Sequence, residues 1–130
     1  MDALIERLEK ATGPDRELDA LLATVLDSSL VVSNVGFAGY VKLSEIDFDV
    51  PAREYTESID AALLLVPEGF EPHQIAFPHG VGRTYAFEIF PPPGHPEWSR
   101  GSICRRGATA PLAICIAALH ARQSAPPREL

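Results

Sequence analysis

Two carboxylates separated by a single residue form the motif of this chain whose spacing best suits chemistry. Asp47 and Asp49 lie in a run, residues 45–50, in which acidic and apolar residues alternate. In an extended strand both aspartates project from the same face, where paired carboxylate oxygens can hold a hard cation such as Mg²⁺. A third ligand would come from His79 or Glu88, and the protein would then be a small metal-dependent hydrolase.

The same run also fits a half-exposed strand with no chemistry. Ile46, Phe48 and Val50 would lie on the buried face and the acids on the face toward water. Charges on the outer strand of a sheet prevent pairing with other strands. We favour this interpretation and keep the hydrolase that uses Asp47 and Asp49 as an alternative.

The histidines and cysteines are spaced too widely to predict a zinc site. His73 and His79 are six residues apart, Cys104 and Cys115 are eleven apart, and the chain has no Cys-x-x-Cys pair. It also lacks the Gly-x-Ser-x-Gly frame of a serine nucleophile. The sequence therefore predicts no catalytic residue, no cofactor and no metal ion.

Two further features bear on binding. Cys104 precedes two arginines, and nearby positive charge lowers the pKa of a thiol, but a single motif of this kind is typical of a solvated loop. The aromatic residues Tyr85, Phe87 and Trp98 would line the pocket of a small-ligand binding module, which is the third function class considered.

The charge of the chain argues against nucleic acid as a partner. The 130 residues carry a net charge of −7, and residues 1–60 hold 13 acids against 5 basic residues. Binding to a phosphate backbone depends on Lys and Arg, so we expect no nucleic-acid partner. No apolar run reaches the length of about 18 residues that suggests a membrane span, and the first residues lack the pattern of a signal peptide. We therefore expect a cytoplasmic protein that does not bind membranes.

The hydrophobic pattern predicts helices and strands along one domain. Helices are expected at residues 2–11, from residue 15 to residue 27, at 56–66 with Thr56 as N-cap, and at 110–122. Strands are expected at 45–50, 73–77 and 83–90, with a loop at 91–107. Apart from the strand at 45–50, the structure and role of residues 30–50 are left open.

This order predicts an α+β fold, in which a small, mostly antiparallel sheet is packed by helices on both faces. The whole of residues 1–130 is expected to form a single α/β/α sandwich domain, and residues 123–130 a flexible tail.

The last helix has no charged residue from Ala110 to Leu119. Its main apolar face consists of Leu112, Cys115, Ile116 and Leu119. Ile114 points the opposite way, where a surface helix would carry a charge, so the helix is either central or has its back face against a partner. We predict that Ile114 lies in a contact with another protein or with a second copy of this chain. We also predict a buried Cys115, an exposed Cys104 and no disulfide.

Three stretches together resemble the phage α/β/α sandwich domain family, a family of small phage and prophage proteins. They are residues 15–23 (DRELDALLA), residues 55–69 (YTESIDAALLLVPEG) and residues 108–119 (ATAPLAICIAAL). The resemblance implies an α/β/α sandwich and a phage or prophage origin, and it implies neither an activity nor a catalytic residue. With the missing catalytic frame, it predicts an accessory protein that acts through protein–protein contacts rather than catalysis.

Overall fold

The computed structural model describes residues 1–33, 38–43, 48–76, 84–94 and 101–124. The helices in this part of the chain are α1 (Asp2–Lys10), α2 (Arg16–Leu26), α3 (Ile59–Leu63) and α4 (Ala110–Ser124). The strands are β1 (Leu30–Val32), β2 (Tyr40–Leu43), β3 (Val50–Pro51), β4 (Glu71–Ala76), β5 (Tyr85–Phe90) and β6 (Ile103–Gly107). These elements confirm the predicted α+β class.

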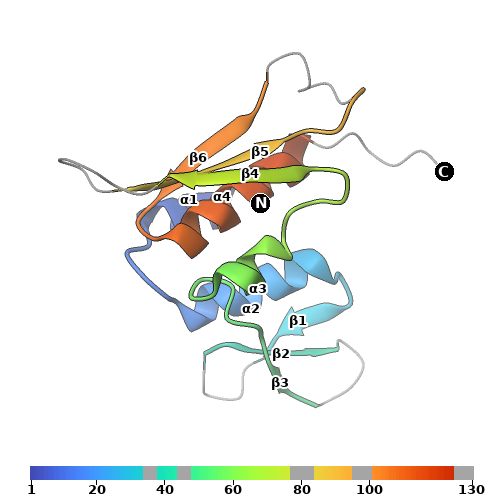
Figure 1. The fold of residues 1–130 in the computed structure, drawn as a ribbon. Coiled ribbons are helices and arrows are strands. Elements are labelled where there is room, and N and C mark those ends of the chain that lie inside the picture. Colours follow the sequence, from blue (N-terminus) through green and yellow to red (C-terminus); the bar gives the residue numbers. More distant parts are fainter. Residues whose placement is uncertain (34–37, 44–47, 77–83, 95–100, 125–130) are drawn as a thin grey trace.

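The described strands form two three-stranded antiparallel sheets, in the orders β1-β2-β3 and β4-β5-β6. Figure 1 shows the helices between the two sheets. Helix α4 packs on β5 and β6, while α2 packs on β1 and β2. The sequence suggested one sheet between layers of helices. The difference arises because the short strands of residues 30–51 pair with one another and not with the later strands.

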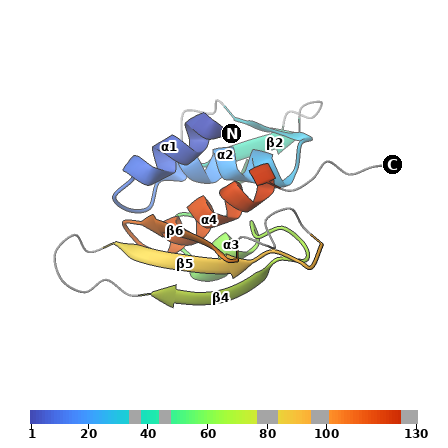
Figure 2. The same ribbon diagram turned by 90° about the horizontal axis from the view of Figure 1, so that it is seen from above.

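Helix α4 lies at the centre of the molecule. Eight consecutive residues, Leu112–Leu119, are 0% exposed. One side of the helix meets the β4-β5-β6 sheet, and its other sides meet α1 and α3 (Figure 2). The end of β6 approaches so closely that a Cβ atom on Gly107 would lie 2.6 Å from the backbone nitrogen of Ala113. A residue with a side chain therefore does not fit at Gly107 without movement of the backbone.

The predicted contact of Ile114 with another chain is wrong. The Ile114 side chain is fully buried within its own chain, because α1 and α3 cover the sides of α4 that face away from the sheet. The absence of charge on α4 thus reflects a central helix, which was the other interpretation of the pattern. The helix also continues to Ser124, so the tail expected from residue 123 begins within the helix, and residues 125–130 lie outside the described residues.

Further expectations also differ from the structure. Residues 103–107, expected in a loop, form β6. The third helix is short, and its N-cap is Ser58, whose hydroxyl accepts a hydrogen bond from the Ala61 amide, while Thr56 is buried in a separate contact. Ile59, expected on the inner face of this helix, is 41% exposed. Of the strand expected at 45–50, residues 45–47 lie outside the described residues, and only Val50 belongs to a strand.

Ile114→Glu should destabilise the folded chain rather than separate a dimer. An unpaired charge in this position would lose hydration without gaining a partner, at a cost of several kcal/mol, compared with a total stability of about 5–15 kcal/mol. Urea denaturation followed by circular dichroism measures the loss. Leu64→Glu is the matched control, because Leu64 is 51% exposed and a surface change should stay within about 0.5 kcal/mol. A folded Ile114→Glu protein of lower mass in light scattering would restore the predicted interface.

Candidate functional site

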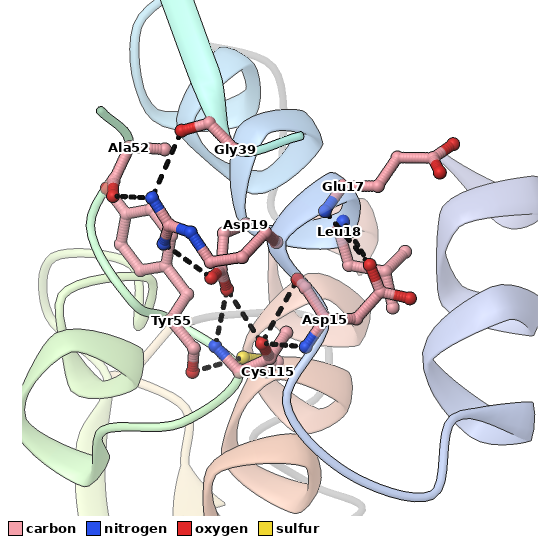
Figure 3. Close-up of polar contacts among 10 residues, drawn as sticks. Asp15, Glu17, Leu18, Asp19, Gly39, Ala52, Tyr55 and Cys115 are labelled. Atoms are coloured by element: carbon pink, nitrogen blue, oxygen red, sulfur yellow. Dashed lines mark hydrogen bonds and ion pairs between the residues drawn. The ribbon is translucent and has the colours of Figure 1, made fainter. Parts of the chain in front are cut away.

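The most buried charged group of the described residues is the carboxylate of Asp19, on helix α2 (Figure 3). Its side chain is 1% exposed, and Arg16 Nη1 contacts it at 2.7 Å. The Thr56 backbone amide and hydroxyl each donate a hydrogen bond to Asp19 Oδ1 at 2.8 Å. The negative charge is thus matched by one guanidinium and two further donors, which is what a buried carboxylate requires.

The partners of Asp19 are themselves held by other segments of the chain. Arg16 Nη2 donates to the carbonyl oxygens of Gly39, at 3.1 Å, and Ala52, at 2.9 Å. The Thr56 hydroxyl also accepts from the Asp15 amide at 2.8 Å. These bonds join the start of α2 to the β1-β2-β3 sheet and to the turn before α3. The cluster therefore serves the fold, and its charged groups have their hydrogen-bonding capacity engaged within the chain.

The residue before α2 explains why this helix begins at Arg16. Asp15 is the N-cap of α2, and its carboxylate accepts from the amides of Glu17, at 2.9 Å, and Leu18, at 3.2 Å. An aspartate in this position satisfies amides that the first helical turn leaves unpaired. Arg16 and Asp19 then project one turn apart on the same helix, as residues with this spacing do.

Cys115 lies beside the cluster but is not a reactive group. Its Sγ donates to the Tyr55 carbonyl oxygen at 3.4 Å. Burial, followed by the negative charge of Asp19, raises the pKa of the Cys115 thiol well above its usual value. Burial also raises the pKa of Tyr55. Both groups stay neutral at physiological pH, so neither supplies a nucleophile.

Of the four residues considered for a metal site, the structure describes Asp49 and Glu88. Asp47 and His79 lie outside the described residues. Asp49 is half-buried and accepts a hydrogen bond from the Ser33 hydroxyl. Glu88 lies on β5, whereas Asp49 directly precedes β3, and these two strands belong to sheets on opposite sides of the helices (Figure 1). Glu88 is therefore excluded as a third ligand for Asp49.

A second polar group lies around Glu88 on the β4-β5-β6 sheet. The Ser102 hydroxyl donates to Glu88 Oε2 at 2.6 Å, and His73 Nε2 lies 3.6 Å from Glu88 Oε1. The carboxylate stands between the serine and the histidine, so the histidine is not placed to take the serine proton, as nucleophilic catalysis would require. In the described part of the chain, no three His, Cys, Asp or Glu residues are grouped so that they could hold a metal ion.

The surface of the β1-β2-β3 sheet offers an apolar hollow. Leu30, Leu43, Phe48 and Val50 line it, and its volume is about 230 Å³. Phe48 is 68% exposed, the highest value among the exposed large hydrophobic side chains of the described residues. We call this feature the β1-β2-β3 hollow. The prediction that Phe48 and Val50 lie on a buried strand face is therefore wrong, since both are exposed, and the sequence pattern makes no prediction for the side chains of Leu30 and Leu43.

Another hollow, of about 280 Å³, lies between α3 and the β4-β5-β6 sheet. It is lined by Leu63, Pro72, His73, Ile75 and Phe87. Of the three aromatic residues predicted to line a ligand pocket, Phe87 is thus in a hollow, Tyr85 is half-buried and Trp98 lies outside the described residues.

Comparisons with protein-family models, with curated proteins and with solved structures gave no match. The resemblance to the phage family therefore stays a prediction from the sequence. Within the described ranges, no helix combines the length and the apolar character needed to cross a bilayer.

Asp19→Ala should destabilise the protein by about 3–5 kcal/mol, because it leaves the Arg16 charge and the Thr56 donors without their common acceptor. Chemical denaturation of the purified variant measures this loss. Glu17→Ala is the control on the same helix. The Glu17 carboxylate pairs with Arg7 at 3.1 Å on the surface, and such pairs contribute about 0–1 kcal/mol. Equal losses in the two variants would contradict a structural role for the Asp19 cluster.

Thiol labelling should modify Cys104 rapidly in the native protein and Cys115 only after unfolding. Cys104 is exposed, while Cys115 is buried and neither is in a disulfide. These positions agree with the prediction from sequence. A chromogenic disulfide reagent, used with and without denaturant, counts the reactive thiols. Cys104→Ser should abolish the fast phase, and fast labelling that survives this substitution would show that Cys115 is accessible.

Proposed function

We propose that this protein is a non-catalytic accessory protein that acts through contacts with another protein. The exposed apolar surface of the β1-β2-β3 sheet carries this proposal. The resemblance described above supports a phage or prophage origin, which we include in the proposal.

The exposed apolar side chains gather in one part of the chain. Nine large hydrophobic residues of the described segments are at least 36% exposed, and six belong to residues 26–50: Leu26, Val31, Val32, Leu43, Phe48 and Val50. Removal of apolar surface from water is the main favourable contribution to most protein–protein association. Val31 projects from the opposite face of the sheet to Val32, whereas Leu43, Phe48 and Val50 line one hollow. Exposed apolar surface of this kind is typical of a protein-binding surface.

The polar clusters support contact rather than catalysis. The carboxylate of Asp19 is held by Arg16 and Thr56 and is 1% exposed, so a substrate in solution does not reach it. The Glu88 carboxylate lies between the Ser102 hydroxyl and His73, so the histidine is not placed to activate that hydroxyl as a nucleophile. The hydrolase alternative would need Asp49, whose described hydrogen bond is to Ser33.

Photo-crosslinking at Phe48 tests the proposal. A photo-reactive phenylalanine analogue at this position should give one discrete adduct with another protein in native host cells, because the side chain projects from the β1-β2-β3 hollow into solvent. The same analogue at Leu64 is the control, since that side chain is 51% exposed but lies at the C-cap of α3. No adduct at Phe48, or the same adducts at both positions, would contradict a specific protein contact at this sheet.

A further inference from the structure

In the described part of the chain the two sheets have four outer strands, and three of these carry features that oppose further pairing. Strand β3 contains Pro51, which cannot donate a backbone hydrogen bond. Strand β4 contains Pro72 and an irregular register between Pro72 and Gln74. Strand β6 carries Arg105 and the exposed Arg106, and it contacts α1. Prolines, bulges and charges are the usual means by which proteins protect sheet edges.

Strand β1 has none of these features. It consists of Leu30, Val31 and Val32, with exposed fractions of 37% for Val31 and 38% for Val32. Among the described residues, β1 pairs only with β2. Branched apolar residues on an open edge are the pattern that accepts an added strand.

The register shows which backbone groups point to the open side of β1. The Ser33 amide donates to the Tyr40 carbonyl oxygen at 2.9 Å, next to the pair Val32–Val41. Because hydrogen-bonded positions alternate along an antiparallel strand, Val31 bonds toward β2 and the Val32 amide points away from it. The Val32 amide is therefore placed to bond an incoming strand.

The apolar side chains next to this edge would receive the side chains of such a strand. Leu30 pairs with Leu43, and Val32 pairs with Val41, so these residues share one face of the sheet. Val41 is buried on this face, whereas Leu30 and Leu43 line the β1-β2-β3 hollow. An added strand would extend the face and cover the exposed side chains beside it.

The negative charge of this part of the chain indicates which kind of strand would bind at the edge of β1. Residues 26–60 hold seven acidic and two basic residues, a net charge of −5. Asp27 is exposed shortly before β1, and its hydrogen bonds from Ser29 lower its pKa, so it stays charged. A second copy of this chain would bring the same negative charge, whereas a segment with Lys or Arg would be attracted.

We infer that the open edge of β1 binds an extended, basic segment of another protein, which adds to the sheet as a further strand and alternates apolar with Lys or Arg side chains. This inference rests on the proposed function and names the contact through which it works. Binding by strand addition takes its affinity from backbone hydrogen bonds and its selectivity from alternate side chains.

A short synthetic peptide in which valine alternates with lysine is the probe. It should bind saturably in fluorescence anisotropy, and amide chemical shifts in NMR should change at residues 30–32. A peptide in which valine alternates with glutamate should bind at least about tenfold more weakly, because it meets like charge. Equal binding of the two peptides, or shift changes confined to other segments, would overturn the inference.

Val32→Pro removes the outward amide and should weaken binding of the valine–lysine peptide by about tenfold. Val32→Lys is a second variant that keeps the amide but places the charge of the peptide on the edge, and it should weaken binding as well. Circular dichroism establishes that each variant is folded. Unchanged affinity for the peptide in a folded variant would exclude strand addition at β1. A stable dimer of the free protein joined through β1 would also contradict the inference, because the edge would then bind a second copy of the chain.

The crosslink at Phe48 separates this inference from the proposed function. If its adduct persists at full yield in the Val32→Pro protein, the protein contact stands but does not use the edge of β1. If no adduct forms in the unaltered chain, the proposed function is contradicted whatever the Val32 variants show. Loss of the adduct in folded Val32→Pro supports both.

Discussion

The complete burial of helix α4 is the constraint on which the rest of the fold depends. Residues 112–119 are apolar around the whole circumference of the helix, so water must be excluded from every side. Burial of each leucine or isoleucine side chain contributes about 1.5–3 kcal/mol to the stability of the fold. A single sheet covers only one side of a helix, so other elements must cover the remaining sides. Strands β5 and β6 cover one side, and α1 and α3 cover the others. Gly107 lets β6 approach the backbone of Ala113 more closely than any side chain would allow.

Because α1, α3 and one sheet already surround α4, the remaining strands must pack elsewhere. They form a second sheet on α2, and the Asp19 cluster joins the two halves of this arrangement. Asp19 reaches Thr56 directly, and through Arg16 it reaches the carbonyl groups of Gly39 and Ala52. A buried carboxylate is stable only with several donors, so this one residue requires segments far apart in the sequence to meet at fixed positions.

The sequence predicts the parts of this fold that depend on local pattern. Helices α1, α2 and α4 follow their apolar periodicity, and Asp15 begins α2 by capping it. Patterns fail where a distant residue decides the outcome. Thr56 looks like a helix cap, but its amide and hydroxyl bind Asp19, 37 residues away, and Ser58 becomes the cap. Likewise, periodicity identifies Ile114 as apolar and off the main face, but cannot say whether its own chain covers it.

The short strands also explain why the exposed apolar surface of the β1-β2-β3 sheet is not predicted from the sequence. Strands β1, β2 and β3 have three, four and two residues, too few for alternation to distinguish a strand from a loop. Phe48 and Val50 do fall on the apolar side of an alternating run, which is the part of the hollow that the sequence signals. Their position beside Leu30 and Leu43 in the hollow depends on the register of the sheet and is visible only in three dimensions.

The two sheets divide the surface into regions of different character. The β4-β5-β6 sheet carries Glu88, the exposed Arg106 and a hydrogen bond to Ser102, so part of its surface is well solvated. The β1-β2-β3 sheet instead exposes Phe48 and an apolar outer strand. The exposed apolar side chains of this sheet do not help to bury helix α4, since Leu112–Leu119 are fully covered by other elements. This sheet buries Val41 in the core and is held to α2 through the Arg16–Asp19 ion pair, so it can present its remaining apolar surface to a partner while the fold stays intact.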